Sequence, residues 1–306
     1  MCIDLKLSVI VPVHNGTKYI NCFKAALDKQ TIKSDSFEVI FIDNLSTDES
    51  FDSLSKKYSE YKNVKVIKYH QKPSSYAARN EGVKLARSET LAFIDIDCIP
   101  EADWLSNIVQ SFGDFTESKL ISGQVFLFYK NKVPNVFELF DQHYFLNQDA
   151  YAIEKSGATA NLTVSKSLFQ GVGGFRDVES GGDRDFCKRV VVENNSCFEF
   201  NNTIVVRHPA RCTIDEIMKK IKRVSTGKVN LAQDKPLFFK LKTLGKNLLG
   251  LIAQRKQFVE IKNVLTTADY NYPLKIKFIY FSLFFGFYAR FVMVKGLLKG
   301  LSTGKV

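Results

Sequence analysis

The sequence predicts an α/β protein with a Rossmann-like, mostly parallel sheet flanked by helices, followed by a helical extension rich in basic and aromatic residues. Short β-branched apolar runs alternate with helical patterns in the first half, and each run is apolar throughout, as in strands covered on both faces. The charge is uneven: from Arg211 onward there are 19 Lys and Arg against 5 Asp and Glu, whereas the rest of the chain has 24 against 27. This asymmetry predicts a C-terminal part with an anionic partner.

The strand and helix patterns follow one another in a regular order. The predicted strands are residues 6–13, 37–43, 64–69 and 90–97. The predicted helices are residues 18–30, 46–58 and 76–87. The second helix opens with a capping-box pattern, Ser46 with Glu49. Such alternation implies a parallel sheet wound right-handedly, in which ligands bind beyond the carboxyl ends of the strands.

Two aspartates, Asp95 and Asp97, end the fourth predicted strand in the stretch LAFIDIDCIP. In an extended strand, residues two apart point to the same side, and two like charges so close repel unless a cation neutralises them. A hard divalent cation such as Mg²⁺ suits carboxylate oxygens and leaves room for phosphate oxygens. The pair therefore predicts a metal with a diphosphate ligand. The alternative is a helix cap: Asp97 could cap a helix that begins near Pro100, and Asp103 could serve similarly.

Motifs that the sequence lacks argue against several classes of protein. The motifs G-x-G-x-x-G and G-x-x-x-x-G-K-[ST] are absent after the first predicted strand, which disfavours a dehydrogenase-type fold and a P-loop. The start of the chain does not resemble a signal peptide. Six scattered cysteines, with no C-x-x-C pair, predict reduced thiols in a cytosolic protein: Cys2, Cys22, Cys98, Cys187, Cys197 and Cys212.

Four stretches, in order, resemble the family 2 glycosyltransferases, which have the GT-A fold: SVIVPVHN, VIFIDNLSTDES, AARNEGVKLARSETLAFIDID and GGFRDVESGGDRDFCKR. The resemblance covers roughly residues 5 to 230. It implies a catalytic domain over residues 1–230, an extension over residues 231–306, and an inverting transfer of a sugar from a nucleotide diphosphate sugar to a hydroxyl. The acceptor implied is a glycan or a lipid-linked glycan of a polysaccharide or cell envelope. The Q-x-x-R-W motif of processive synthases is absent, which favours the addition of a single sugar.

The resemblance also assigns roles to individual residues. The stretch DID looks like the D-x-D motif of the family, so that Asp97, with His208 as a further ligand, would hold Mg²⁺ or Mn²⁺. Asp43 matches the residue that contacts the base, and a carboxylate that accepts the N–H of uracil suggests a UDP-sugar. The residues implied in donor binding are Pro12, His14, Asp43, Arg79 and Asp95. Alternatives stay open, since His14 could be a turn residue, Arg79 a solvated helix residue and His208 structural.

The base of the reaction is implied to be Asp183, in the stretch ESGGDRDFCKRV. An inverting displacement needs a carboxylate to take the acceptor proton. The family often has glutamate before this aspartate, and this sequence has Gly182 there. Asp185 is the rival base, and a helix N-cap is the structural alternative for Asp183.

Residues 231–306 mix basic and apolar residues at helical spacing. The longest uninterrupted apolar core, residues 278–289, has 12 residues, whereas about 20 are needed to span a bilayer. Arg290 would place a charge inside a longer span. Basic residues around this core favour a helix lying on an anionic membrane surface: Lys275, Lys277, Arg290, Lys295 and Lys299. A spanning helix and a helix packed against protein remain alternatives.

We therefore expect a cytoplasmic enzyme, peripheral at the inner face of the cell membrane. Two other functions stay open: a sugar nucleotidyltransferase, and a non-catalytic binding module with a basic tail. Nucleic acid is not expected as a partner, because the aromatic residues of the tail lie in apolar runs and not in an RNA-binding pattern.

Overall fold

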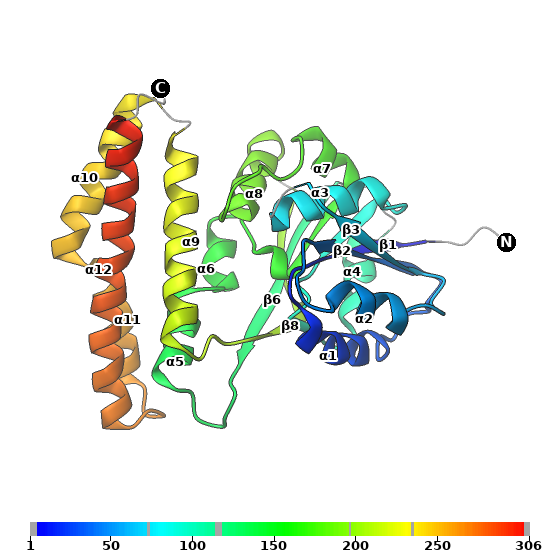
Figure 1. The fold of residues 1–306 in the computed structure, drawn as a ribbon, viewed down its shortest axis with the longest axis horizontal. Helices are drawn as coiled ribbons and strands as arrows, with labels where there is room; N and C mark the ends of the chain where they lie inside the picture. Colours follow the sequence, from blue (N-terminus) through cyan, green and yellow to red (C-terminus); the bar gives the residue numbers. More distant parts are fainter. Residues whose placement is uncertain (1–4, 72–73, 114–117, 196, 234–235, 303–306) are drawn as a thin grey trace. The chain divides into compact units, whose positions relative to one another are not determined.

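The computed structural model describes residues 5–71, 74–113, 118–195, 197–233 and 236–302 (Figure 1). The chain forms two compact units. The first unit comprises Met1–Phe128, Asn147–Asp177 and Gly182–Pro209, and the second comprises Tyr129–Leu146, Val178–Gly181 and Ala210–Val306.

A mixed eight-stranded sheet forms the centre of the first unit. Its strands are β1 (Leu7–Val13), β2 (Phe37–Asn44), β3 (Val64–Tyr69), β4 (Thr90–Phe93), β5 (Ile99–Pro100), β6 (Leu120–Phe128), β7 (Leu162–Ser165) and β8 (Phe198–Pro209). Their order is β3-β2-β1-β4-β7-β6-β8-β5. Strands β3, β2, β1 and β4 pair in parallel, as do β6 and β8, whereas β7 is antiparallel to both neighbours and β5 is antiparallel to β8. The predicted α/β class with a mostly parallel sheet is confirmed.

The helices of the first unit are α1 (Thr17–Leu27), α2 (Ser50–Lys57), α3 (Ser75–Leu85), α4 (Trp104–Phe112), α6 (Gln148–Ile153), α7 (Lys166–Gly171) and α8 (Gly182–Glu193), with a 3₁₀ turn over Thr159–Asn161. The helices of the second unit are α5 (Val136–Tyr144), α9 (Ile214–Gln233), α10 (Leu237–Ala253), α11 (Arg255–Thr266) and α12 (Tyr272–Ser302). The predicted boundary after residue 230 falls inside α9.

Two local predictions are wrong. The expected capping box of Ser46 and Glu49 does not form, because α2 begins at Ser50 and the Ser46 hydroxyl instead accepts a hydrogen bond from the Asn15 backbone N–H at 2.9 Å. The strand expected to run to residue 97 ends at Phe93, and the chain then turns, with the Cys98 N–H bonded to the Asp95 carbonyl at 3.0 Å. The two aspartates therefore do not share one face of a strand.

Asn161 joins the middle of the sheet. Its side chain is fully buried, and its amide donates to the carbonyls of Gln124 and Ile204, both at 2.8 Å, across the irregular register between β6 and β8. Its oxygen accepts the indole N–H of Trp104, the only tryptophan, at 2.9 Å. Because every hydrogen-bonding atom of this amide has a partner, the amide bridges the strands at no desolvation penalty.

The second unit is held together by an aromatic and aliphatic core. Side chains from α5, α9 and α12 meet in it, including Phe140, Ile217, Phe278 and Phe285. Asp141 of α5 is fully buried and accepts hydrogen bonds from the backbone and guanidinium of Arg211, at 2.9 Å each. Figure 1 shows α12 running alongside α9 and α10.

The cysteines of the described residues are free thiols: Cys22, Cys98, Cys187, Cys197 and Cys212. Cys2 lies outside the described residues.

A buried carboxylate, Glu38 in β2, ties the start of the parallel sheet to the loop after α3. It accepts hydrogen bonds from the Ser8 hydroxyl (2.7 Å), from the Arg87 backbone N–H (2.7 Å) and Nε (2.9 Å), and from Lys65 Nζ (3.3 Å). Burial raises the pKa of Glu38, but these hydrogen bonds and the charge of Lys65 outweigh burial, so the pKa lies below its ordinary value.

We expect Glu38→Gln to lower the free energy of unfolding at neutral pH by about 2 kcal/mol. The lowered folded-state pKa means that the ionised carboxylate stabilises the fold above the unfolded-state pKa, and that this contribution disappears as the pH falls through the folded-state pKa. Urea unfolding of both proteins should therefore show a difference that shrinks in acid. A difference independent of pH would contradict this account of Glu38.

Candidate active site

The ends of β1 and β2 form one edge of the candidate site. Pro12 and Asp43 lie on these neighbouring parallel strands, in which Val13 is the partner of Asp43. His14 follows β1 directly, and its Nδ1 lies 2.8 Å from the carbonyl oxygen of Asn44. Because a carbonyl only accepts, this nitrogen is the donor, and the bond holds the exposed ring of His14 beside the end of β2.

Asp43 is almost completely buried, with 4% of its surface exposed. Its Oδ1 accepts the backbone N–H of Ser46 at 3.3 Å, whereas its Oδ2 has no hydrogen-bond partner among the residues that the structure describes. A buried acceptor without a partner costs about 1–3 kcal/mol. An N–H group supplied by a ligand would remove this cost.

Arg79 and Asp95 form an ion pair at the end of β4. Arg79 comes from α3, its side chain is 3% exposed, and its guanidinium donates to Asp95 Oδ1. The alternative of a solvated helix residue is wrong for Arg79, because a guanidinium buried to this extent needs a carboxylate. The pair fixes the turn that follows β4.

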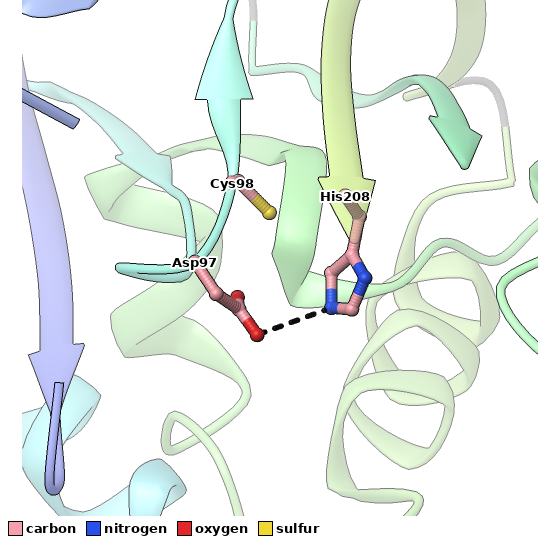
Figure 2. Close-up of side chains that lie close together, drawn as sticks. All are labelled: Asp97, Cys98 and His208. Atoms are coloured by element: carbon pink, nitrogen blue, oxygen red, sulfur yellow. Dashed lines mark ion pairs between the residues drawn. The ribbon is translucent and has the colours of Figure 1, made fainter. Parts of the chain in front are cut away.

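Asp97 and His208 face each other across that turn, as Figure 2 shows. Asp97 Oδ2 lies 3.5 Å from His208 Nε2, and His208, at the end of β8, is 6% exposed. The His208 Nδ1 lies 2.7 Å from the carbonyl oxygen of Pro209 and must donate to it. In the neutral ring the lone pair therefore lies on Nε2, toward Asp97, which is the arrangement a metal ligand needs.

Cys98 completes this cluster, whose three ligand atoms lie within 4.8 Å of one another. Burial first, and the charges of Asp97 and Asp95 second, raise the pKa of the Cys98 thiol well above its usual value. Without a metal this thiol is protonated, and hard cations such as Mg²⁺ and Mn²⁺ bind oxygen ligands in preference to sulfur. A carboxylate oxygen and an imidazole nitrogen remain, and this donor set fits Mg²⁺ or Mn²⁺ better than a thiolate-seeking metal. The alternative of a helix cap for Asp97 is wrong, because residues 99–100 form β5 and α4 begins at Trp104.

Asp183 lies inside the first turn of α8 rather than at its N-cap. Its Oδ1 accepts the backbone N–H of Arg184 at 2.9 Å and the hydroxyl of Tyr76 at 3.2 Å. Both of these bonds go to one oxygen.

Asp185, the rival base, has a different environment. Its Oδ1 accepts from Arg176 at 3.2 Å and its Oδ2 from Arg189 at 2.9 Å, so both oxygens are held in ion pairs. Arg189 also donates to the carbonyls of Val172 and Gly174. This network fastens α8 to the glycine turn before it, and we expect Asp185 to be structural.

Tyr76 is a site residue that the sequence analysis missed. A Cβ added at Gly182 would lie 2.9 to 3.0 Å from atoms of the Tyr76 ring, so the ring occupies the space that a side chain at position 182 would need. Position 182, where the resemblance implies that glutamate is frequent, is therefore bordered by this tyrosine ring. The pattern of the sequence held no signal for this pairing, since the two residues are 106 positions apart.

Helix α3 connects the two halves of the site. Tyr76 reaches Asp183 from this helix, and Arg79, one turn later, reaches Asp95. The guanidinium carbon of Arg79 lies 5.6 Å from the centre of the Tyr76 ring, within the range of a cation–π interaction. A continuous chain of contacts thus runs from Asp183 to the turn that carries Asp97.

The comparisons with known proteins agree with this architecture. Residues 8–160 match the family described as "Glycosyl transferase family 2". Glycosyltransferase AglE of Haloferax volcanii is 31% identical over 229 residues, which are 74% of this chain and 73% of the relative. A poly(ribitol-phosphate) beta-glucosyltransferase of Bacillus spizizenii is 34% identical over 94 residues, but these are only 30% of this chain and 15% of that relative.

Solved structures share the fold at low sequence identity. A mannosyltransferase of Pyrobaculum calidifontis, in complex with GDP-Man and Mn²⁺, has a TM-score of 0.61 at 16% identity, over 98% of this chain and 88% of its own. Residues 1–349 of TarS of S. aureus, in complex with UDP-GlcNAc, have a TM-score of 0.53 at 18% identity, over 98% and 92%. The relatives and the family match together establish more than the fold: this chain belongs to glycosyltransferase family 2 and is a glycosyltransferase with a GT-A-like fold.

Proposed function

We propose that this glycosyltransferase moves a sugar from a UDP-sugar to a hydroxyl of a glycan or lipid-linked acceptor, with inversion at the anomeric carbon, in the synthesis of a polysaccharide or cell-envelope glycan. The observation that carries the proposal is the chain of contacts from Asp183 through Tyr76 and Arg79 to Asp95. Through side chains of helix α3, these contacts link Asp183, the proposed base, to the turn that carries Asp97, the proposed metal ligand. The acceptor class is supported by the relatives, one of which is named for glucosyl transfer to poly(ribitol-phosphate).

Asp43 supports uridine as the base of the donor. Uracil presents one ring N–H, and Asp43 offers one buried oxygen that lacks a partner among the described residues. Guanine presents an amino group beside its ring N–H and would need both oxygens, of which Oδ1 is already bonded to the Ser46 N–H. Pro12 and His14 would line the same pocket, and Asp95 and Arg79 would lie toward the ribose and the diphosphate.

Asp97 and His208 would hold the divalent cation. When bound, Mg²⁺ or Mn²⁺ supplies positive charge that stabilises the departing nucleoside diphosphate. The chain's own residues prepare this site: the Pro209 carbonyl fixes the His208 tautomer, and the turn at Asp95 directs Asp97 toward His208.

Asp183 would act as the general base. Its place in the first turn of α8 favours the ionised carboxylate, because the amide dipoles of a helix N-terminus stabilise negative charge. Tyr76 donates to one oxygen and thereby orients the other toward the acceptor hydroxyl. The proton of that hydroxyl passes to Asp183 as the oxygen attacks the anomeric carbon.

Calorimetry with UDP tests the donor and metal sites. We expect UDP binding that requires Mn²⁺ or Mg²⁺ and is lost in EDTA. Asp97→Asn should abolish the metal-dependent binding of UDP. Asp43→Asn should weaken binding by about tenfold or more, because the buried acceptor is replaced by a group that also donates. Metal-independent UDP binding, or a preference for GDP, would contradict the assignment. Release of pyrophosphate from a sugar phosphate and UTP would indicate nucleotidyl transfer instead.

Asp183→Asn tests the base. The change keeps the shape of the side chain and removes its proton affinity, so transfer should slow by about 10²–10⁴-fold with UDP affinity unchanged. Asp185→Asn is the matched control, two residues away. It should lower the melting temperature, because it breaks ion pairs to Arg176 and Arg189, and it should leave the transfer rate close to that of the wild type. Normal transfer by Asp183→Asn with loss of transfer in Asp185→Asn would reverse the two roles.

Tyr76→Phe tests whether this residue positions the base. The ring stays against Gly182 and only the hydroxyl is removed, so we expect kcat to fall by about tenfold while KM for the donor is unchanged. Tyr58→Phe is the matched control, since Tyr58 is also a buried tyrosine and its hydroxyl has no partner among the described residues. Equal effects of the two changes, or a change in donor KM alone, would remove Tyr76 from the mechanism.

A further inference from the structure

Helix α10 turns an apolar face to solvent. Every residue of this helix is at least partly exposed, and seven large apolar side chains are 47% to 87% exposed: Leu237, Phe238, Phe239, Leu241, Leu248, Leu249 and Ile252. At 100° per residue all of these side chains except Phe239 fall within an arc of about 120°. Gly245 lies in the same arc, and a Cβ added there would meet nothing within 4 Å. This is the reverse of the usual pattern, in which the apolar stripe of a helix faces the protein interior.

Helix α12 carries a second exposed stripe. Its large apolar side chains at intervals of three, four or seven residues are 41% to 75% exposed: Tyr272, Ile276, Tyr280, Phe284, Phe287, Phe291 and Leu298. Phe278 and Phe285, on another face of the same helix, are buried in the core with α5 and α9. The helix therefore has an inner apolar face that is packed and an outer apolar face that is not.

The two helices pack against each other within the second unit. Arg290 of α12 lies against the backbone of α10 at Gly250, where an added Cβ would touch the guanidinium. We call the exposed residues of both helices the α10/α12 stripes. Apolar surface of this extent on a folded protein marks an interaction site.

The charges that accompany the stripes are all positive. The sequences of α10 and α12 contain eight Lys or Arg and no Asp or Glu. By helical geometry Lys242 and Lys246 border the stripe of α10, and Lys277 and Lys295 border that of α12. These four lysines are exposed. Lysines at the edge of an apolar stripe can extend their ammonium groups to anionic lipid headgroups while the stripe enters the acyl boundary.

Charge complementarity selects the partner. A second copy of this chain would bring the same lysines against these lysines, and the like charges would repel. A nucleic acid would bind the lysines and leave the aliphatic and aromatic side chains in water. An anionic membrane surface matches both the apolar stripes and their cationic borders.

The packing of α12 indicates a helix that lies on a membrane rather than one that crosses it. By length and composition α12 could span a bilayer, with 22% of its most apolar window buried inside the protein. However, Arg290 donates to Gln257 Oε1 of α11 at 3.3 Å, and the inner face of α12 packs on α5 and α9. A spanning orientation would break these contacts, whereas a membrane on the outer face leaves them intact.

We propose that the α10/α12 stripes dock this enzyme on an anionic lipid surface, with the stripes in the interfacial region and the bordering lysines at the headgroups. This binding is separate from catalysis. It needs neither the donor site nor the base.

Co-sedimentation of the 306-residue protein with vesicles tests the proposal. At low salt the protein should bind vesicles of phosphatidylglycerol and phosphatidylcholine, bind pure phosphatidylcholine more weakly, and be released by an alkaline carbonate wash. Ile252→Glu should weaken vesicle binding by about 10- to 100-fold, because the side chain that would enter the lipid is replaced by a negative charge, which the anionic surface repels.

Ile153→Glu is the matched control. Ile153 of α6, in the first unit, is 86% exposed and Ile252 is 87% exposed, so both changes place the same charge at equally exposed isoleucines. Ile153→Glu should bind vesicles like the wild type, and both variants should bind UDP like the wild type. The proposal is wrong if the wild-type protein ignores anionic vesicles, if both variants lose binding equally, or if the protein resists the carbonate wash as a spanning protein would. It is also wrong if the protein is a dimer in solution that Ile252→Glu dissociates.

Discussion

The ion pair between Arg79 and Asp95 is the contact on which the candidate site depends. A guanidinium this deeply buried is stable only beside a carboxylate, so the pair fixes both the helix that carries Arg79 and the turn that carries Asp95. Helix α3 can lie close to the sheet because Gly82 faces Ile10 of β1, where an added Cβ would come within 2.5 Å of the isoleucine side chain. The position of Tyr76, one turn before Arg79, follows from the same placement.

The site departs from the family pattern at position 182. The space beside position 182 is filled by the Tyr76 ring, and the tyrosine hydroxyl bonds to the neighbouring aspartate. Burial raises the pKa of the Tyr76 hydroxyl above its usual value, with the charge of Asp183 adding to the effect, so the hydroxyl remains a donor. A neutral donor from α3 thus takes the place of a glutamate on α8. A glutamate would have added a second negative charge beside Asp183.

The two units differ in charge as well as in fold. The chain from Arg211 onward carries the excess of basic residues, with 19 Lys and Arg against 5 Asp and Glu, whereas the rest of the chain has 24 against 27. The proposed membrane contact would also concentrate the enzyme where a lipid-linked acceptor is found.

The sequence by itself determined the α/β class, the parallel strands β1 to β4 and the family, because each depends on local apolar periodicity or on short ordered motifs. Asp43, Asp95 and Asp97 could be singled out for the same reason, as polar residues that end apolar runs.

The tertiary structure alone decided the turn after Phe93, which sends Asp95 to Arg79 and Asp97 to His208 instead of leaving them on one face. It alone brought Tyr76 to Asp183 and moved Ser46 from a helix cap to a loop contact with Asn15. It also showed which face of α12 is packed and which is exposed, since both faces are apolar and the sequence holds no difference between them. In each case the deciding partner is distant along the chain, and a local pattern carries no information about a distant partner.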